Sequence, residues 1–588
     1  MRFLGNVLAT ILGLFIFCML FFFGIIFIAA IAGSSSGSDN VTVKSNSIIE
    51  LDLSKVTQDY AGKSKYKEFD YFEARHDGLS DVLKAIEYAK DDSDIKGISI
   101  LNNNSELGAA QTKALRDQLE DFKKSGKFVY SYANVYSQKD YYLNSVANTV
   151  YMNPVGNMDF KGLSSQIMFF KDLQEKTGVK LEVIRHGKYK SAVEPFLENK
   201  MSDANREQVT SLLNSVWNSM LADISKSRKI SVEHLNEIAN GLLARTAELA
   251  KAEKLIDIVA YEDVYHNDIK KALKVEAKDD YNSIKILDYA KNVATTAGNS
   301  AKNKIAIVYA QGEILSGEGS ESYIGEGSMR RAIKEAREDK NVKAIVLRID
   351  SPGGSALTSD LIWREIELTK KTKPVVVSMG NVAASGGYYI ACNANEIFAE
   401  ENTITGSIGV FGLLPNMTEL SNKIGIHTEE VKTNTNASGY SPFLPLDPNF
   451  KNFTQQEIER IYTTFVTKVA TGRKMTFAQI DSVAQGRVWS GSEALKIGLV
   501  DKIGGMDDAI AQAAKLAKIT DYKTQDYPEY EKNLRDLLSG MGIPFMQSRE
   551  NLIIEEIGEA NYKLLQQVKK LSQQTGIQAM MPFKIDIY

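Results

Sequence analysis

The chain has 588 residues, of which 44% are hydrophobic, and a formal net charge of −4 at pH 7. This length allows two or more globular domains, and the charge gives no basic excess, so a nucleic-acid partner is not expected. Cys18 lies in an apolar run and Cys392 lies far from it, so the sequence predicts no intrachain disulfide.

An apolar run over residues 7–33 follows a short tail, residues 1–6, whose one charged side chain is Arg2. About 20 apolar residues span a bilayer, whereas the core of a cleaved signal peptide has about 7 to 15. The run therefore predicts a retained transmembrane anchor. Arg2 precedes the anchor and the first lysine after it is Lys44, so the positive-inside rule places the tail in the cytoplasm and the rest outside.

An internal repeat relates two halves of the chain. Each half alternates amphipathic helices with buried strands, as in the helix predicted over 79–89 and the strand predicted over 95–101. This alternation favours a mostly parallel α/β sheet in each copy. An unchanged offset of 247 residues maps first-half residues onto identical ones in the second half, namely Ala85, Ile86, Ala89, Lys96, Ile98, Ser131, Asn134, Val135, Tyr141, Tyr142, Ser191, Pro195, Phe196 and Leu197.

The repeat also sets the predicted domain boundaries. A Gly/Ser-rich spacer over 34–45 separates the anchor from a first repeat over 46–290. A polar linker over 291–303 leads to a second repeat over 304–520, and a helical extension over 521–588 follows.

In the second repeat, a strand predicted over 343–349 ends in a glycine-rich turn with the sequence DSPGGS, residues 350–355. Only glycine easily supplies the backbone freedom for a turn that exposes N–H groups. Gly354 is therefore a candidate hydrogen-bond donor to an oxyanion that develops during acyl transfer.

A second turn carries a candidate nucleophile. The β-branched run over 374–378 predicts a buried strand, and the stretch MGNVAASGGYY over 379–389 leads into a helix, so Ser385 falls on a strand-to-helix turn. Small neighbours let a substrate backbone approach, and the N–H of Gly386 can bind a developing oxyanion. On its own, this stretch is equally consistent with a closely packed helix entry that has no catalytic role.

Three separated motifs agree with one family: DSPGGS at 350–355, AASGGYY at 383–389 and TGSIGVFG at 405–412. Together they resemble the ClpP/crotonase superfamily and, within it, the long, two-repeat form of the signal peptide peptidase A family. The resemblance implies two tandem ClpP/crotonase-like α/β repeats after the transmembrane helix. It also implies a homotetramer in the bacterial inner (cytoplasmic) membrane, with the bulk of each chain in the periplasm and the site facing a membrane-directed cavity.

A serine nucleophile needs a base. The five histidines lie in no motif that pairs with Ser385, although a spatial pairing stays open. A lysine can serve if burial lowers its pKa from about 10.4 toward 7 to 8. By resemblance, the family carries such a lysine in the segment YKSAVEPF, which stands unaltered at 189–196 and identifies Lys190 as the base. Lys188 is a competitor, but only Lys190 matches the family pattern.

The two repeats differ where this chemistry is expected. Ser385 corresponds to Gln138, so the first repeat lacks the nucleophile. Lys190 corresponds to Ala437, and no lysine lies between residues 432 and 451, so the second repeat lacks the base. The sequence therefore predicts a site that needs both repeats.

Ser407 matches the family serine that hydrogen-bonds the lysine amine and orients it. A hydroxyl does this without adding a negative charge, which would raise the lysine pKa. The alternative is that the Ser407 hydroxyl only forms hydrogen bonds within a buried turn.

The residues and the resemblance together predict a membrane-anchored serine endopeptidase that degrades remnant signal peptides through an acyl-enzyme. Its partners would be peptide substrates and the lipid bilayer. The sequence has no metal-binding or nucleotide-binding motif, so no cofactor is expected. Two alternatives stay open: a crotonase-type acyl-CoA enzyme, which would use paired glycine N–H groups on a thioester enolate, and a catalytically silent membrane scaffold.

Overall fold

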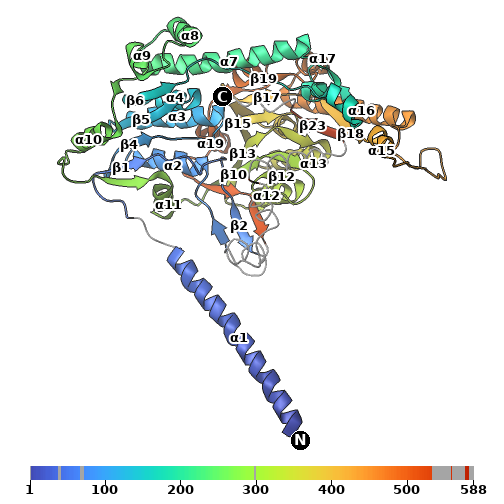
Figure 1. Ribbon diagram of the computed structural model, residues 1–588, viewed down its shortest axis with the longest axis horizontal. Coiled ribbons are helices and arrows are strands. Elements are labelled where there is room, and N and C mark those ends of the chain that lie inside the picture. The colour runs from blue at the N-terminus through green and yellow to red at the C-terminus, as the bar shows by residue number, and fades with distance from the viewer. Residues whose placement is uncertain are drawn as a thin grey trace.

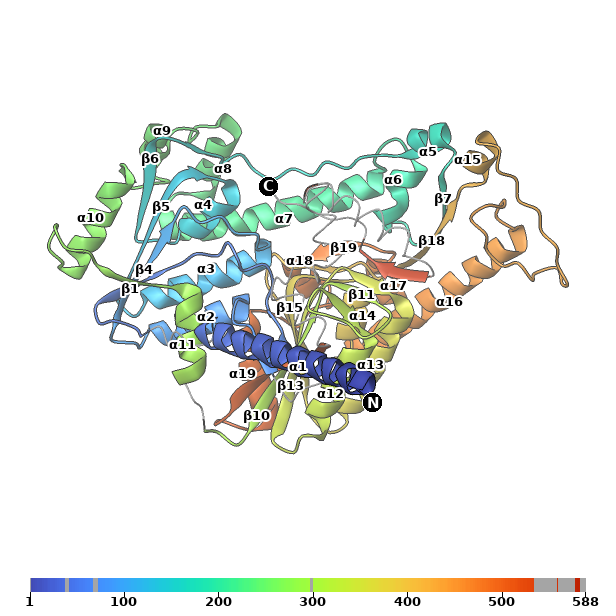
Figure 2. The same ribbon diagram turned by 60° about the horizontal axis from the view of Figure 1, so that its bottom comes forward.

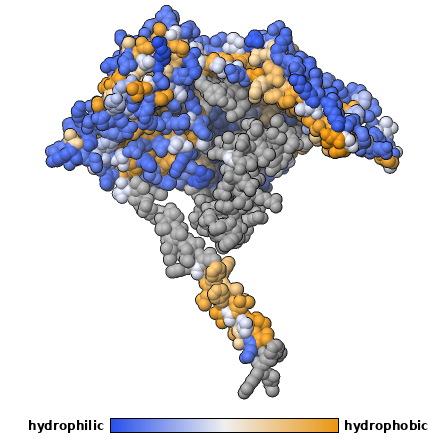
Figure 3. All heavy atoms as spheres, in the orientation of Figure 1, coloured by the Kyte–Doolittle hydropathy of each residue, from blue (hydrophilic) through white to orange (hydrophobic). Residues whose placement is uncertain are grey.

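The computed structural model describes residues 2–36, 42–66, 72–296, 300–532, 558 and 577–581. Its first helix, α1 (Arg2–Ser36), extends away from the body of the protein (Figure 1). The segment Gly5–Gly24 within it is long and apolar enough to cross a membrane, and none of it is buried against the rest of the chain. Figure 3 shows this apolar helix below a mostly hydrophilic body.

A six-stranded sheet forms the core of the first half, and all its pairs are parallel. The predicted strand 95–101 is its strand β4, and the predicted helix 79–89 is α2. Apolar residues three and four apart in α2 are buried, which is why this stretch folds as a helix against the sheet. In spatial order the strands are β8 (Ile258–Val259), β6 (Thr149–Met158), β5 (Phe128–Tyr136), β4 (Ile95–Leu101), β1 (Ser47–Glu50) and β9 (Asn282–Lys285).

The second half repeats this plan with an eight-stranded sheet. Its pairs are parallel except for β17 with β19, and apolar β-branched residues fill its central strands because both faces are covered. The predicted fold class, two tandem α/β repeats, is confirmed. The strands are β10 (Lys304–Gln311), β13 (Val342–Ser351), β15 (Val375–Ala384), β16 (Glu396–Ala399), β17 (Ile404–Gly406), β19 (Val488–Ser490), β20 (Lys502–Ile503) and β21 (Lys523–Tyr527).

A third sheet joins strands from distant parts of the chain. The order is β12-β11-β14-β23-β18-β7, and β7 of the first half runs antiparallel to β18 of the second over seven residue pairs. This pairing places the chain that follows β7 beside the second repeat. The strands are β12 (Tyr323–Gly325), β11 (Glu313–Leu315), β14 (Gly353–Ser355), β23 (Ile577–Met580), β18 (Val410–Asn416) and β7 (Lys180–His186). A small sheet holds β2 (Lys63–Tyr66), β3 (Phe72–Ala74) and β22 (Glu529–Lys532).

Helices cover these sheets and connect the halves. The long helix α7 runs across the top of the body in Figure 1 and spans it again in Figure 2. Hydrogen bonds tie it to the second half, including Ser215 Oγ to Ser490 Oγ at 2.7 Å. First-half helices after α2 are α3 (Ala109–Lys123), α4 (Gln138–Asn144), α5 (Lys171–Thr177), α6 (Glu194–Leu197), α7 (Asp203–Arg228), α8 (Val232–Gly241), α9 (Ala247–Ala252), α10 (Glu262–Leu273) and α11 (Ile286–Thr296).

The second-half helices carry a projecting coil, residues 424–447, between α15 and α16, which we call the arm. These helices are α12 (Glu326–Glu338), α13 (Ala356–Lys370), α14 (Gly386–Ala391), α15 (Thr418–Lys423), α16 (Pro448–Arg473), α17 (Phe477–Val483), α18 (Gly491–Lys496) and α19 (Met506–Ala517).

A buried ion pair also links the halves. Arg348 on β13 donates from Nε to Asp59 Oδ2 at 2.6 Å, and the two side chains are only 5% and 4% exposed. Gln111 on α3 donates to the other oxygen of Asp59 at 2.8 Å. A buried charge needs such partners because its desolvation is costly.

Two boundary expectations can be compared with the described residues. The stretch predicted as a linker, 291–303, begins inside α11, which continues to Thr296. The predicted C-terminal helical extension, 521–588, lies mostly outside the described residues, and its described parts are the strands β21, β22 and β23.

Candidate active site

Ser385 stands on the turn between β15 and α14, as the sequence predicts. It is fully buried, with φ 53° and ψ −112°, a left-handed conformation that is strained for a residue with a Cβ. Hydrogen bonds hold the turn: Ser385 N donates to Gly406 O, and Tyr389 N donates to Ser385 O, both at 2.8 Å. Gly386 must be small, since a Cβ there would lie 2.7 Å from Ser359 Oγ.

Lys190 reaches this turn from the other half of the chain. It follows β7, and the pairing of β7 with β18 brings its loop against the second repeat. Tyr189 N donates to Gln485 O at 2.8 Å, which fixes the loop. The Lys190 side chain is fully buried, and its Nζ lies 2.9 Å from Ser385 Oγ.

The surroundings of the Lys190 amine suit an uncharged base. Nζ lies 3.0 Å from Ser407 Oγ and 3.1 Å from Ser407 O. A neutral amine can donate its two hydrogens to these oxygens and accept the Ser385 hydroxyl hydrogen with its lone pair. Burial lowers the pKa of Lys190 well below its ordinary value, and no carboxylate among the described residues pairs with it to restore the charge.

Several groups that enclose the lysine stem were not identified from the sequence. A Cβ on Gly486 would lie 2.6 Å from Lys190 Cβ, and a Cβ on Gly409 would lie 3.1 Å from Lys190 Cδ. The Phe411 ring centroid lies 5.9 Å from Nζ. Gly409 and Phe411 belong to the TGSIGVFG motif. The sequence therefore identified the motif but not these contacts with Lys190.

The two glycine turns predicted to donate to an oxyanion lie side by side. Gly353 and Gly354 have φ values of 97° and 151°, which favour glycine at both positions. A Cβ on Gly354 would lie 2.0 Å from Ile314 O, and one on Gly353 would lie 2.7 Å from Gly386 N. The sheet edge at β14 therefore approaches the start of α14, where the Gly386 N–H is located.

The competing candidates lie elsewhere. Lys188 is exposed, and its Nζ lies 5.2 Å from the Tyr189 ring centroid. His186 stacks on Tyr462 at 3.9 Å between ring centroids. In the part of the chain that the structure describes, none of the five histidines hydrogen-bonds to Ser385.

The first repeat has no corresponding site. Gln138, which stands where the second repeat has Ser385, is buried and accepts from Lys161 N at 3.0 Å and Gly162 N at 2.8 Å. Ala437, the counterpart of Lys190, lies in the exposed arm. Each half therefore contributes a different polar side chain to one shared cluster.

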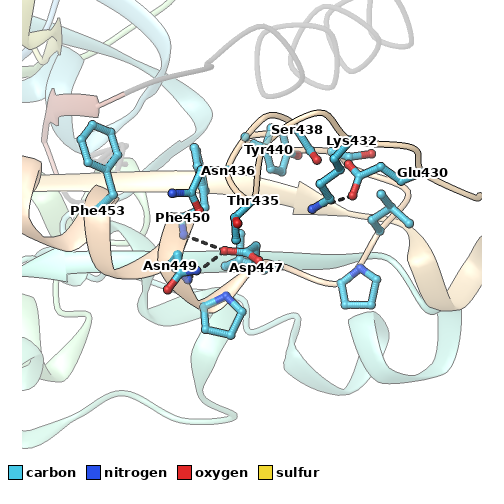
Figure 4. A pocket seen from close by; sticks show the side chains of 16 residues that line it. Glu430, Lys432, Thr435, Asn436, Ser438, Tyr440, Asp447, Asn449, Phe450 and Phe453 are labelled. Carbon is cyan, nitrogen blue, oxygen red and sulfur yellow. Dashed lines mark hydrogen bonds and ion pairs between the residues drawn. The ribbon is translucent and has the colours of Figure 1, made fainter.

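A separate cleft of about 620 Å³ lies on the arm (Figure 4). Three of its charged groups have partners: Lys432 pairs with Glu430 at 2.6 Å, and Asp447 accepts from the backbone N–H groups of Asn449 and Phe450 at the start of α16. None of the predicted site residues lines this cleft. It lies on the arm and the start of α16, away from the Ser385 turn.

The tandem α/β repeats and the buried serine beside a lysine are typical of a serine hydrolase. Comparison of the sequence with known protein families then identifies the family. The family model described as "Peptidase family S49" matches residues 121–276 and 367–520, so the chain belongs to that family. Two matched segments agree with the two repeats. Membership in a peptidase family supports serine protease activity. It does not support the two alternatives left open by the sequence, a crotonase-type acyl-CoA enzyme and a catalytically silent membrane scaffold.

Named relatives agree with this assignment. "Protease 4" of Salmonella typhi is 38% identical over 79% of this chain and 76% of that relative. "Protease 4" of Haemophilus influenzae is 35% identical over 90% of this chain and 88% of that relative. "Serine protease SPPA, chloroplastic" of Arabidopsis thaliana is 34% identical over 77% of this chain and 68% of that relative. Among solved structures, a ClpP1 mutant from Listeria monocytogenes matches at 19% identity and TM-score 0.24, covering 35% of this chain and 94% of that chain.

Proposed function

We propose that the protein is a membrane-anchored serine endopeptidase with a Ser385/Lys190 dyad, and that it degrades remnant signal peptides. The observation that carries the proposal is the 2.9 Å separation between Lys190 Nζ and Ser385 Oγ in a fully buried site. A serine is a weak nucleophile at neutral pH, and an adjacent uncharged lysine is one of the groups that can activate it.

The proposed reaction has two stages. Lys190 takes the hydroxyl proton as Ser385 Oγ attacks the substrate carbonyl carbon, and it then gives that proton to the leaving amine. Water next attacks the acyl-enzyme, with Lys190 again serving as base. The N–H groups of Gly354 and Gly386 stabilise the negative oxygen of both tetrahedral intermediates, and Ser407 orients the lysine amine.

The apolar nature of the proposed substrates has two supports. The helix α1 would hold the protein in a bilayer, where signal peptides remain after cleavage. Buried apolar side chains also flank the site, among them Val193, Phe411 and Leu413. Met580 of β23 packs against this cluster, and an apolar substrate residue in its place would gain from the same contact.

The proposed location is the bacterial inner membrane, with the body of the protein on the periplasmic side. Support comes from the position of Arg2 and from the length of α1.

A variant that starts near Asn46 should be soluble and should retain peptide hydrolysis, because the spacer separates the anchor from the folded body. Aggregation of that variant would count against an independent soluble body.

The proposed assembly is a homotetramer. The exposed apolar side chains of the arm support this proposal, because such side chains are common at contacts between subunits. Examples are Ile424, Ile426, Val431 and Phe443.

The dyad is tested by hydrolysis of a fluorogenic apolar peptide. Ser385→Ala and Lys190→Ala should each lower kcat/KM by several orders of magnitude, and the double variant should be scarcely slower than either, because the two groups act as a unit. Lys188→Ala is the matched control and should keep near-normal activity. Normal rates in Lys190→Ala together with loss in Lys188→Ala would reject Lys190 as the base.

A further inference from the structure

The ladder between β13 and β15 is interrupted directly before the two glycine turns. Ile349 pairs with Met379. The next pair joins Ser351 to Ala383, so β13 advances by two residues while β15 advances by four. A single residue of β13, Asp350, therefore faces a bulge in β15. Such bulges leave backbone groups without ladder partners and are frequent next to active sites, where they change the direction of a side chain.

The carboxylate of Asp350 lies in this bulge. Val382 N donates to Asp350 Oδ1 at 2.9 Å, and Asn381 Nδ2 donates to Asp350 Oδ2 at 3.2 Å. A Cβ on Gly380 would lie 3.1 Å from Asp350 Cβ, so the close approach leaves little room for a larger residue there. Both oxygens of Asp350 therefore accept hydrogen bonds from the strand that leads to Ser385.

The side chain of Asn381 also connects the bulge to the first repeat. Its Oδ1 accepts at 3.0 Å from Gln111 N, one of the N–H groups at the start of α3 that have no partner within the helix. Gly108, directly before α3, leaves space for this side chain, because a Cβ there would lie 2.5 Å from Asn381 Oδ1. The amide of Asn381 therefore has a fixed orientation, with its oxygen toward α3 and its nitrogen toward Asp350.

The bulge precedes both proposed oxyanion donors by the same distance along the chain. Asp350 stands four residues before Gly354, and Val382 stands four residues before Gly386. Hydrogen bonds to the carboxylate replace the ladder here and fix how far β15 advances before pairing resumes at Ser351. The spacing of the two glycine N–H groups depends on this register, and an oxyanion needs both donors within about 3 Å.

The first repeat lacks this carboxylate. By the offset of 247 residues, Asp350 corresponds to Asn103 and Asn381 corresponds to Asn134. Asn103 Oδ1 accepts from Leu53 N at 3.0 Å, outside the strand that carries Asn134. The repeat without a serine nucleophile thus has a neutral side chain at this position, and the negative charge is specific to the other copy.

We propose that Asp350 is a positioning residue for hydrolysis: its carboxylate, oriented by Asn381, holds the N–H groups of Gly354 and Gly386 in register with each other. The proposal rests on the proposed function, because these glycines act as oxyanion donors only in that reaction. Burial and the nearby Asp59 carboxylate raise the pKa of Asp350 above its ordinary 3.8. The test is therefore made at pH 9, where the carboxylate is charged.

Asp350→Asn removes one of the two acceptors. The new amide nitrogen would face Asn381 Nδ2, which cannot turn away unless Asn381 Oδ1 loses its bond to Gln111 N. In the full-length chain in detergent, kcat for an apolar fluorogenic peptide should fall roughly 10-fold to 100-fold, with KM within about twofold of wild type. A peptide aldehyde forms a tetrahedral adduct whose oxygen lies at the oxyanion site, so its affinity should fall by the same factor as kcat/KM. Affinity for the corresponding peptide alcohol should not change.

Exchange of the two side chains tests the hydrogen-bond pattern itself. In the double variant Asp350→Asn/Asn381→Asp, the amide and the carboxylate trade places, so the N–H groups of Val382 and Gln111 both keep an acceptor. Its kcat should return to within about threefold of wild type, whereas Asn381→Asp alone places two carboxylates together and should be slow. Asn103→Ala is the matched control in the first repeat and should leave kcat and KM unchanged.

A milder variant covers the case in which Asp350→Asn does not fold. Asn381→Ala keeps the bond from Val382 N and removes only the orienting amide, so kcat should fall roughly threefold to tenfold, again with KM unchanged. Unchanged kcat in this variant would overturn the role of Asn381 in orienting the carboxylate.

The outcomes separate this inference from the proposed function. Wild-type protein that hydrolyses the peptide, with Ser385→Ala inactive, supports the proposed function. In that case, wild-type kcat in Asp350→Asn, a loss confined to KM, or a double variant no faster than the single variants would overturn the positioning role alone. Wild-type protein that does not hydrolyse the peptide overturns the proposed function and this inference with it.

Discussion

Gly486 lies directly against the backbone of Lys190: a Cβ on Gly486 would be 2.6 Å from Lys190 Cβ and 2.7 Å from its nitrogen. The observed position of Lys190 therefore requires that residue 486 have no side chain. Gly486 lies in the connection between α17 and β19, next to Gln485, whose carbonyl accepts from Tyr189 N, so this connection fixes the lysine loop at two adjacent points.

Gly486→Ala should displace Lys190 and lower kcat for peptide hydrolysis on the order of 100-fold, since small displacements of catalytic groups have effects of this size. The matched control is Gly425→Ala. Gly425 has φ 83°, close to the 82° of Gly486, but a Cβ there would meet nothing within 4 Å. Equal losses in the two variants would mean that backbone strain, and not contact with Lys190, causes the effect.

Ser407→Ala should lower kcat/KM roughly fivefold to tenfold, the equivalent of one hydrogen bond of about 1 kcal/mol. The loss is modest because the Ser407 carbonyl, 3.1 Å from Lys190 Nζ, remains as a partner. Steady-state kinetics on the same apolar peptide give the ratio. A loss as large as that of Lys190→Ala would contradict a purely orienting role for the hydroxyl.

Lys190→Met should change how stability depends on pH. Burial lowers the pKa of Lys190 in the folded protein below its ordinary 10.5. As pH falls from about 10.5 toward the folded pKa, only the unfolded chain takes up this proton, so wild-type stability falls by up to about 1.4 kcal/mol per pH unit. The stability of Lys190→Met relative to wild type should therefore increase from pH 10 to pH 7 in urea unfolding.

The exposed Lys188 provides the control for that measurement. Lys188→Met, measured over the same pH range, controls for replacing a lysine of this loop by methionine. A difference between Lys190→Met and wild type that does not change with pH would show that burial does not lower the pKa of Lys190 in the folded protein.

Asp59→Asn should destabilise the protein by about 3 to 5 kcal/mol, because it leaves the buried Arg348 charge without its counter-ion. Adding Arg348→Met should recover part of that loss. Asp77→Asn is the surface control: Asp77 pairs with Arg75, whose side chain is 52% exposed, so its loss should cost less than about 1 kcal/mol. Urea unfolding of wild type and the three variants measures these differences, and an Asp59→Asn effect as small as the control's would contradict the role of this pair in joining the halves.

The sequence was informative where local pattern determines structure. The spacing of apolar residues, three and four apart, predicted α2 with its observed bounds, and the β-branched run before Ser385 predicted the strand that positions it. The position of Ser385 on a turn followed from the strand predicted before it and the helix predicted after it. The fold class followed from the alternation of helices and strands in two copies, together with the family resemblance.

Contacts between distant segments could not be predicted in the same way. Nothing local to β7 indicates that it pairs with β18, yet this pairing is what brings Lys190 to Ser385. The selection of Lys190 over Lys188 needed a family resemblance, because a strand would place both on one face. The location of β23 between β14 and β18 likewise depends on tertiary pairing, and its short sequence carries no signal for it.

The most direct test of the account is the rate at which a fluorophosphonate labels Ser385, measured from pH 6 to pH 10 in wild type and Lys190→Ala. The account predicts that the wild-type rate rises with pH through a single titration with a midpoint well below 10.5, the ordinary lysine value, as Lys190 loses its proton. In Lys190→Ala the labelling should be slower by orders of magnitude and this titration should be absent. Persistence of the same midpoint and a near-normal rate in Lys190→Ala would contradict the assignment of Lys190 as the base for Ser385.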